Sequence, residues 1–101
     1  KEAKLIQKAG AFSIVLECLS PKSAKIITNK LKIPTIGIGS SSNCDGQILV
    51  TDDMLGLSGF YPKFVKKYLN LNRIIENAVK QYTRDVKLKK FPSNKNFLNG
   101  S

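Results

Sequence analysis

The stretch that decides the fold is AFSIVLECLSPKSAKIITNKLKIPTIGIG, residues 11–39. Its first part, residues 11–19, is an apolar run rich in branched and aromatic side chains, which is typical of a strand buried on both faces. Ser20-Pro21 follows, the pattern of a helix N-cap and first helical residue. The stretch therefore begins as a strand that leads directly into a helix.

The helix over 20–32 carries apolar residues at spacings of three and four. Pro34 ends it, because the residue before a proline avoids the helical backbone region. A second short buried strand follows over 35–38. Strand, helix and strand make a β-α-β unit, so we expect two adjacent, parallel strands with a right-handed crossover.

The segments on either side of this unit are less regular. Residues 1–9 have helical periodicity but no cap before them, so we expect chain upstream of Lys1. After the second strand comes a polar, turn-forming loop. QILV, residues 47–50, is then a third short strand or the start of a helix.

The second half of the chain is predicted to be mainly helical. Residues 52–62 contain two glycines and are predicted to be irregular. Residues 62–69 and 70–91 have apolar side chains at helical spacing. Residues 92–101 are predicted to be a loose tail.

A chain of 101 residues forms at most one small domain. Parallel strands buried on both faces need helices on both sides or a closed barrel, and three strands cannot close a barrel. The predicted fold class is therefore α/β, as a slice of an α/β barrel or of a doubly wound sheet.

The net charge of +10 raises nucleic acid or an acidic protein as a partner. However, only Arg73 and Arg84 of the 17 basic residues are arginines, and the lysines are spread from Lys1 to Lys95. Specific readout of phosphates and bases relies on the arginine fork. A solvated basic surface is therefore favoured, and a small basic binding module without catalysis is the alternative.

Other features exclude some classes of protein. No apolar run approaches the roughly 20 residues that span a bilayer, so no membrane segment is predicted. The absence of histidine excludes a Cys/His zinc site. Cys18 and Cys44 are interpreted as reduced thiols of a cytoplasmic protein.

Glu17 is the candidate catalytic residue. It lies at the carboxyl end of the first strand, where reactive groups gather in α/β folds. A carboxylate partly desolvated there becomes a stronger general base. On spacing alone a structural role is favoured, in which Glu17 pairs with a lysine at the strand end or caps the helix turn at Ser20.

Three further patterns admit a functional and a structural interpretation. Gly37 and Gly39 could bring backbone N–H groups close to an anion, but a tight turn is favoured. The stretch is not a dinucleotide fingerprint, because Ser42 stands where a third glycine is needed. Cys18 is interpreted as a buried, inert thiol, since no histidine can activate it.

Asp45, Asp52 and Asp53 are candidate ligands for a hard cation, and loop aspartates of this kind are more often turn formers.

Five motifs in order carry a resemblance to a known family: GAFSIVLEC, IPTIGIG, CDGQILV, DMLGL and PKFVK. Over residues 2–92 the chain resembles the C-terminal part of ketopantoate hydroxymethyltransferase, also called 3-methyl-2-oxobutanoate hydroxymethyltransferase. The resemblance implies a (β/α)8 TIM barrel of the phosphoenolpyruvate/pyruvate superfamily type. Residues 1–101 would then be a partial barrel domain with its last three strands and their helices, and 92–101 its loose tail.

The resemblance also implies an activity. Such enzymes transfer a one-carbon unit from 5,10-methylenetetrahydrofolate to 3-methyl-2-oxobutanoate, which gives 2-dehydropantoate for pantothenate and coenzyme A biosynthesis. They are cytoplasmic, use Mg²⁺ and are typically decamers. In the family, the glutamate of the VLEC motif is the proton acceptor, and that position is Glu17 here.

The resemblance limits what this chain can contribute. The family's metal-binding and substrate-binding residues lie in the first half of the barrel, so no metal ligand is assigned here, and the chain alone is expected to be inactive. Some positions depart from the family pattern. Asp52 replaces a histidine, Ser40 an alanine and Ser41 a glycine, and Lys95 and Asn96 replace a Glu-His pair.

Overall fold

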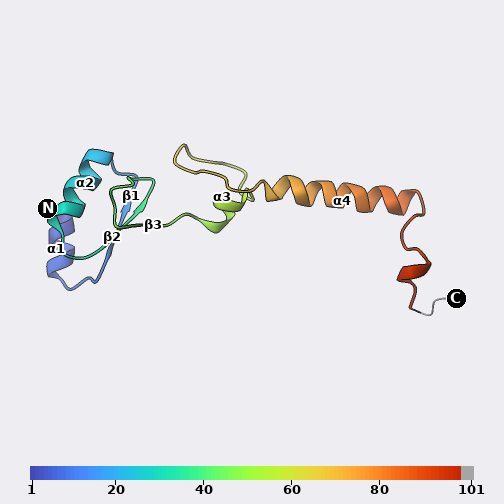
Figure 1. Ribbon diagram of the computed structural model, residues 1–101, viewed down its shortest axis with the longest axis horizontal. Helices are drawn as coiled ribbons and strands as arrows, with labels where there is room; N and C mark the ends of the chain where they lie inside the picture. Colours follow the sequence, from blue (N-terminus) through green and yellow to red (C-terminus); the bar gives the residue numbers. More distant parts are fainter. Residues whose placement is uncertain (99–101) are drawn as a thin grey trace.

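The computed structural model describes residues 1–98 (Figure 1). The elements are, in order, α1 (Glu2–Lys8), β1 (Ile14–Glu17), α2 (Pro21–Lys30), β2 (Thr35–Ile38), β3 (Gly46–Gln47), α3 (Thr51–Leu55), α4 (Leu71–Lys87) and the 3₁₀ turn η1 (Asn94–Asn96). The predicted α/β class is confirmed. The strands are shorter than the apolar stretches of sequence from which they were predicted.

The strands form one parallel sheet in the order β1-β2-β3. Ile14 lies opposite Thr35, and Glu17 lies opposite Ile38 at the other end of the pair. The predicted β-α-β unit is therefore confirmed. Of the stretch predicted as a third strand or a helix start, residues 47–50, only Gln47 lies in a strand, the two-residue β3, which pairs with the middle of β2.

Helix α2 begins as its sequence predicts. The Ser20 hydroxyl accepts a hydrogen bond from the Ser23 N–H at 3.2 Å, and Pro21 occupies the first helical position. Ala24 on this helix is fully buried against Leu16 of β1. The helix thus covers one face of the sheet.

A polar cluster holds the opposite end of β2. Thr35 is fully buried, and its backbone N–H donates to Asp45 Oδ2 at 2.9 Å. The hydroxyls of Thr28 and Thr35 lie 2.8 Å apart. These bonds tie α2, β2 and the loop before β3 together at the amino end of the sheet.

The helix predicted over 62–69 is wrong. This segment holds a single turn, in which the Val65 N–H donates to the Pro62 carbonyl at 2.9 Å. The N–H groups of Tyr68 and Leu69 donate instead to the Met54 carbonyl, at 2.8 and 3.3 Å. Tertiary hydrogen bonds therefore replace those of a local helix.

Two segments predicted to be irregular are more ordered than expected. Residues 51–55 form α3, which ends at Gly56 in the left-handed conformation with φ of 77°. In the tail, Ser93 and Asn96 exchange hydrogen bonds that cap η1. The last three residues of the predicted tail lie outside the described residues.

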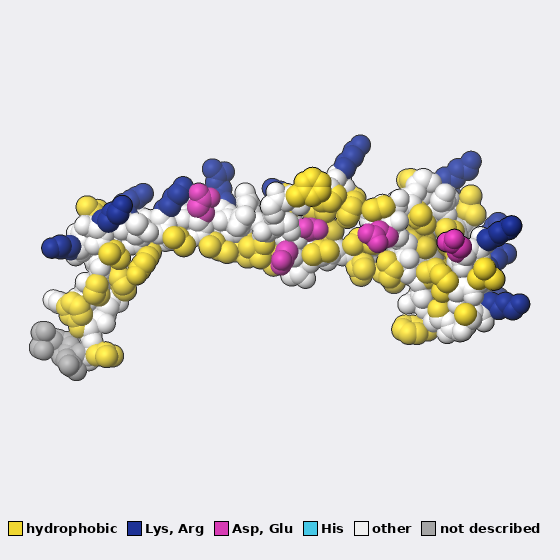
Figure 2. Space-filling model, turned by 180° about the vertical axis from the view of Figure 1, so that it is seen from behind, with side chains coloured by type: hydrophobic (Ala, Val, Ile, Leu, Met, Phe, Trp, Pro, Cys, Tyr) yellow, Lys and Arg dark blue, Asp and Glu magenta, His cyan; other side chains and the backbone are white. Residues whose placement is uncertain are grey.

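Helix α4 confirms the helix predicted over 70–91 and extends away from the sheet (Figure 1). The chain measures 72 × 28 × 16 Å as a result. Hydrophobic side chains line one side of α4, and Lys and Arg side chains project from the other (Figure 2). Within residues 1–98, no helix is long and apolar enough to cross a membrane.

Candidate functional site

The candidate site lies where β1 and β2 end. Glu17 is the last residue of β1, and Gly39 follows the last residue of β2. The Cys18 N–H donates to the carbonyl of Ile38, the last residue of β2, at 2.9 Å, which extends the pairing one residue past the end of β1. The two carboxyl ends thus meet at one edge of the sheet, as the β-α-β topology predicted.

The carboxylate of Glu17 belongs to the face of the sheet that no helix covers. Successive strand residues point to opposite faces, and paired residues of parallel strands share a face. Leu16 is 4% exposed against α2, whereas Val15 is 53% exposed. Glu17 therefore shares the open face with Val15, Ile36 and Ile38.

Neither structural alternative for Glu17 is realised in the described residues. The one ion pair of residues 1–98 joins Glu76 and Lys80 on α4. The helix that begins near Ser20 is capped by the Ser20 hydroxyl itself. Glu17 is left as an exposed carboxylate without a protein partner at the carboxyl edge.

The expected desolvation of Glu17 is not supplied by this chain. Its side chain is exposed, and it lines an open hollow of about 510 Å³ along the free edge of β1, together with Val15 and Leu19. Desolvation requires other atoms over this face. The topology places the carboxylate, but the described residues do not enclose it.

Cys18 is exposed, so its interpretation as a buried thiol is wrong. Its φ of 53° lies in the left-handed region, which is uncommon for a residue with a side chain. The backbone therefore turns out of the strand directly after Glu17. Cys44, by contrast, is buried in the small core.

Ser40 connects both sides of this turn, and sequence reasoning recorded it only as a departure. Its hydroxyl donates to the Leu16 carbonyl at 2.6 Å and accepts from the Leu19 N–H at 3.1 Å. The signal in the sequence was a hydroxyl two residues after the end of a strand, beside the end of the neighbouring strand.

The glycines of β2 make room for side chains. A Cβ at Gly37 would lie 3.0 Å from Cys44 Sγ, and one at Gly39 would lie 2.8 Å from the Phe64 ring. Gly39 also has a φ of 63°. The favoured interpretation of a tight turn fits Gly39, but Gly37 lies within β2, where it pairs with Leu16 and Gln47. At both positions the space that a Cβ would fill is already occupied.

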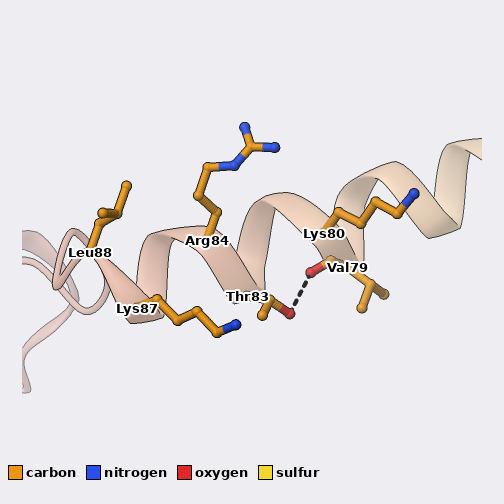
Figure 3. Close-up of a pocket in the computed structure, with 6 residues that line it drawn as sticks. All are labelled: Val79, Lys80, Thr83, Arg84, Lys87 and Leu88. Atoms are coloured by element: carbon orange, nitrogen blue, oxygen red, sulfur yellow. Dashed lines mark hydrogen bonds between the residues drawn. The ribbon is translucent and has the colours of Figure 1, made fainter.

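A second hollow, of about 480 Å³, lies far along the chain on α4 (Figure 3). Its lining comes from one helix and the residue after it, and includes the cations of Lys80, Arg84 and Lys87. The Thr83 hydroxyl there donates back to the Val79 carbonyl at 3.0 Å. It contains no carboxylate or activated nucleophile, so the strand ends remain the candidate active site.

The profile of one protein family, ketopantoate hydroxymethyltransferase, matches residues 1–94. The chain belongs to this family. Three curated relatives carry the name 3-methyl-2-oxobutanoate hydroxymethyltransferase. The protein of Anaplasma marginale (strain Florida) is 55% identical over 92 residues, which are 91% of this chain and 33% of the relative.

The other two relatives agree. The Clostridioides difficile (strain 630) protein is 55% identical over 96 residues, covering 94% of this chain and 35% of the relative. The Syntrophus aciditrophicus (strain SB) protein is 57% identical over 93 residues, covering 91% and 34%. The chain thus spans about a third of the length of the curated relatives it matches.

The candidate cation ligands of this chain do not gather into a cluster within the described residues. Among residues 1–98, no group of three or more acidic or cysteine side chains could hold a metal ion. Asp45 binds Thr35, and Asp53 accepts a hydrogen bond from the Ser58 hydroxyl. The preferred interpretation as a loop residue fits Asp45, whereas Asp52 and Asp53 lie in the first turn of α3.

Asp45 has a structural role that mutation can test. In the full-length protein, Asp45→Ala should lower the free energy of unfolding by about 1–3 kcal/mol, because it leaves the N–H of the buried Thr35 without its acceptor. Urea denaturation measures this. Asp52→Ala, at an exposed position, is the control and should change stability little. A changed Mg²⁺ requirement in Asp45→Ala would contradict the structural role.

Proposed function

We propose that this chain is the C-terminal part of a 3-methyl-2-oxobutanoate hydroxymethyltransferase, with Glu17 as its general base. The observation that carries the proposal is an exposed, unpaired carboxylate on the open face at the carboxyl edge of parallel strands. Family membership and the names of the relatives support the activity. They favour an enzyme over a basic module that binds nucleic acid or an acidic partner.

The proposed step at Glu17 is a proton transfer. The carboxylate accepts the C3 proton of 3-methyl-2-oxobutanoate, and the electron pair of that C–H bond forms the enolate. The methylene carbon of 5,10-methylenetetrahydrofolate is bonded to both N5 and N10 of the folate. The enolate carbon bonds to it as one of these C–N bonds breaks, and water then replaces the second C–N bond. The proton taken from C3 and one proton from water end on the two folate nitrogens. Water supplies the hydroxyl group, and the products are 2-dehydropantoate and tetrahydrofolate.

The proposed architecture is a (β/α)8 barrel of which β1, β2 and β3 are the last three strands. The open face of the sheet would become the interior of the barrel, since α2 covers the other face. The rest of the protein would then enclose Glu17 and raise its basicity by desolvation. Mg²⁺ would be held by that part, because residues 1–98 offer no ligand set.

The remaining parts of the proposal come from the family resemblance. The full enzyme would act in the cytoplasm, in pantothenate and coenzyme A biosynthesis, and would be a homo-oligomer, typically a decamer. This chain alone would be inactive, because the residues that bind metal and substrate lie outside it.

The experiment is an assay of the full-length protein that contains this chain. We expect formation of 2-dehydropantoate that depends on both 3-methyl-2-oxobutanoate and 5,10-methylenetetrahydrofolate. In D₂O without the folate, the protein should exchange the C3 proton of the oxo acid for deuterium. The matched control is 3,3-dimethyl-2-oxobutanoate, which has no C3 proton and should give no product. A folded protein that neither exchanges the proton nor forms product would refute the proposal.

A further inference from the structure

We propose that Ser40 is a positioning residue for Glu17; this inference rests on the proposed function. Its hydroxyl bridges the Leu16 carbonyl and the Leu19 N–H. The two residues between these groups are Glu17 and Cys18. One side chain from the end of β2 therefore holds both ends of the turn that carries the candidate base.

The hydroxyl of Ser40 suits this bridge because it is both a donor and an acceptor. Its single hydrogen goes to the Leu16 carbonyl at 2.6 Å, and its oxygen receives the Leu19 N–H at 3.1 Å. Both bonds span more than 20 positions of sequence. They therefore attach the turn after β1 to the segment that follows β2, and are not local bonds within the turn.

The Ser40 bridge is particular to this chain, because the family pattern has alanine at this position. It supports a turn with an unusual backbone. Cys18 adopts a φ of 53°, which is unfavourable for a residue with a side chain unless its surroundings hold it there. The Cys18 N–H already bonds to the Ile38 carbonyl at 2.9 Å. With the Ser40 bridge, three hydrogen bonds from the end of β2 hold the backbone on both sides of Glu17.

The consequence concerns the direction of the carboxylate. A general base transfers protons efficiently only when it is held at hydrogen-bond distance from the proton it removes. Glu17 has no ion pair within the described residues that could orient it. The main chain at Leu16–Leu19 then determines the position and direction in which the Glu17 side chain leaves the backbone. Ser40 holds that main chain in place.

The neighbouring serine provides a matched control. The Ser41 hydroxyl accepts from the backbone and side-chain nitrogens of Asn43, both at 3.1 Å, within its own loop. It makes no contact of this kind with β1. Ser41→Ala thus removes a hydroxyl from the adjacent position without touching the turn that carries Glu17.

The test compares Ser40→Ala, Ser40→Thr and Ser41→Ala in the full-length protein. Ser40→Ala should lower kcat about tenfold with KM within about twofold, because a misplaced base slows the proton transfer more than binding. Ser40→Thr keeps the hydroxyl and should recover most of the loss. Ser41→Ala should match the unmodified protein. C3 deuterium exchange should follow kcat.

A second readout does not depend on catalysis. Amide hydrogen exchange at Leu19 should be about tenfold faster in Ser40→Ala, because its N–H loses its acceptor. Faster exchange, lower kcat and rescue by threonine together support the inference. Unchanged Leu19 exchange, or faster exchange with unchanged kcat, overturns it. Absence of product from the unmodified protein refutes the proposed function instead, so the two failures are distinguishable.

Discussion

Glu17→Gln in the full-length protein should lower kcat by about 10²–10⁴-fold, the usual contribution of a general base. Glutamine has nearly the same shape as glutamate but cannot accept the C3 proton. The substitution does not change the backbone at the end of β1, so substrate binding, and with it KM, should change little. Both product formation and C3 deuterium exchange measure the effect, and both should fall together.

Glu76→Gln is the matched control for this prediction. Glu76 is an exposed glutamate on α4, away from the strand ends, and its hydrogen bond to Lys80 lowers the pKa of its carboxyl group. Its replacement should leave kcat unchanged. Retention of more than about a tenth of kcat in Glu17→Gln would contradict the role of general base, since even a modest base contributes more than that.

The β-α-β unit was predictable because its signals are local. The Ser20-Pro21 cap, the proline that ends the helix and the two apolar runs each act over a few residues. The topology then follows, because parallel neighbours put their carboxyl ends at one edge. Glu17 could therefore be placed at the rim of the sheet from sequence alone.

What the sequence could not show depends on distant contacts. Residues 62–69 have helical spacing, yet the N–H groups at the end of this segment bond to Met54. Cys18 follows an apolar strand, yet the left-handed turn exposes it. The Ser40 bridge joins positions more than 20 residues apart. In each case a tertiary hydrogen bond or turn outweighs the local pattern.

The environment of Glu17 was also unpredictable, for a related reason. Its basicity depends on which atoms lie over the open face of the sheet, and within the described residues Glu17 stays exposed beside an open hollow. Local sequence can position a carboxylate at a strand end, but it cannot enclose it. The exposure of the same face should also lower the stability of the isolated chain.

Residues 1–101, expressed alone, should show no cooperative thermal transition. The buried hydrophobic core of the described residues consists of Leu16, Ala24 and Cys44. The radius of gyration is 23.3 Å, whereas a compact domain of this length has about 13 Å. So small a core cannot offset the conformational entropy of about 100 ordered residues.

Calorimetry and two-dimensional NMR of the isolated chain, with the full-length protein as the control, test this prediction. Apolar side chains such as Val15 and Val79 are more than half exposed, at 53% and 56%, so the isolated chain should also associate. The full-length protein should melt cooperatively, because the remaining part of the proposed barrel would cover these surfaces. A sharp transition from a dispersed monomer of the isolated chain would mean that residues 1–98 reach a compact arrangement that covers Val15 and Val79 without help.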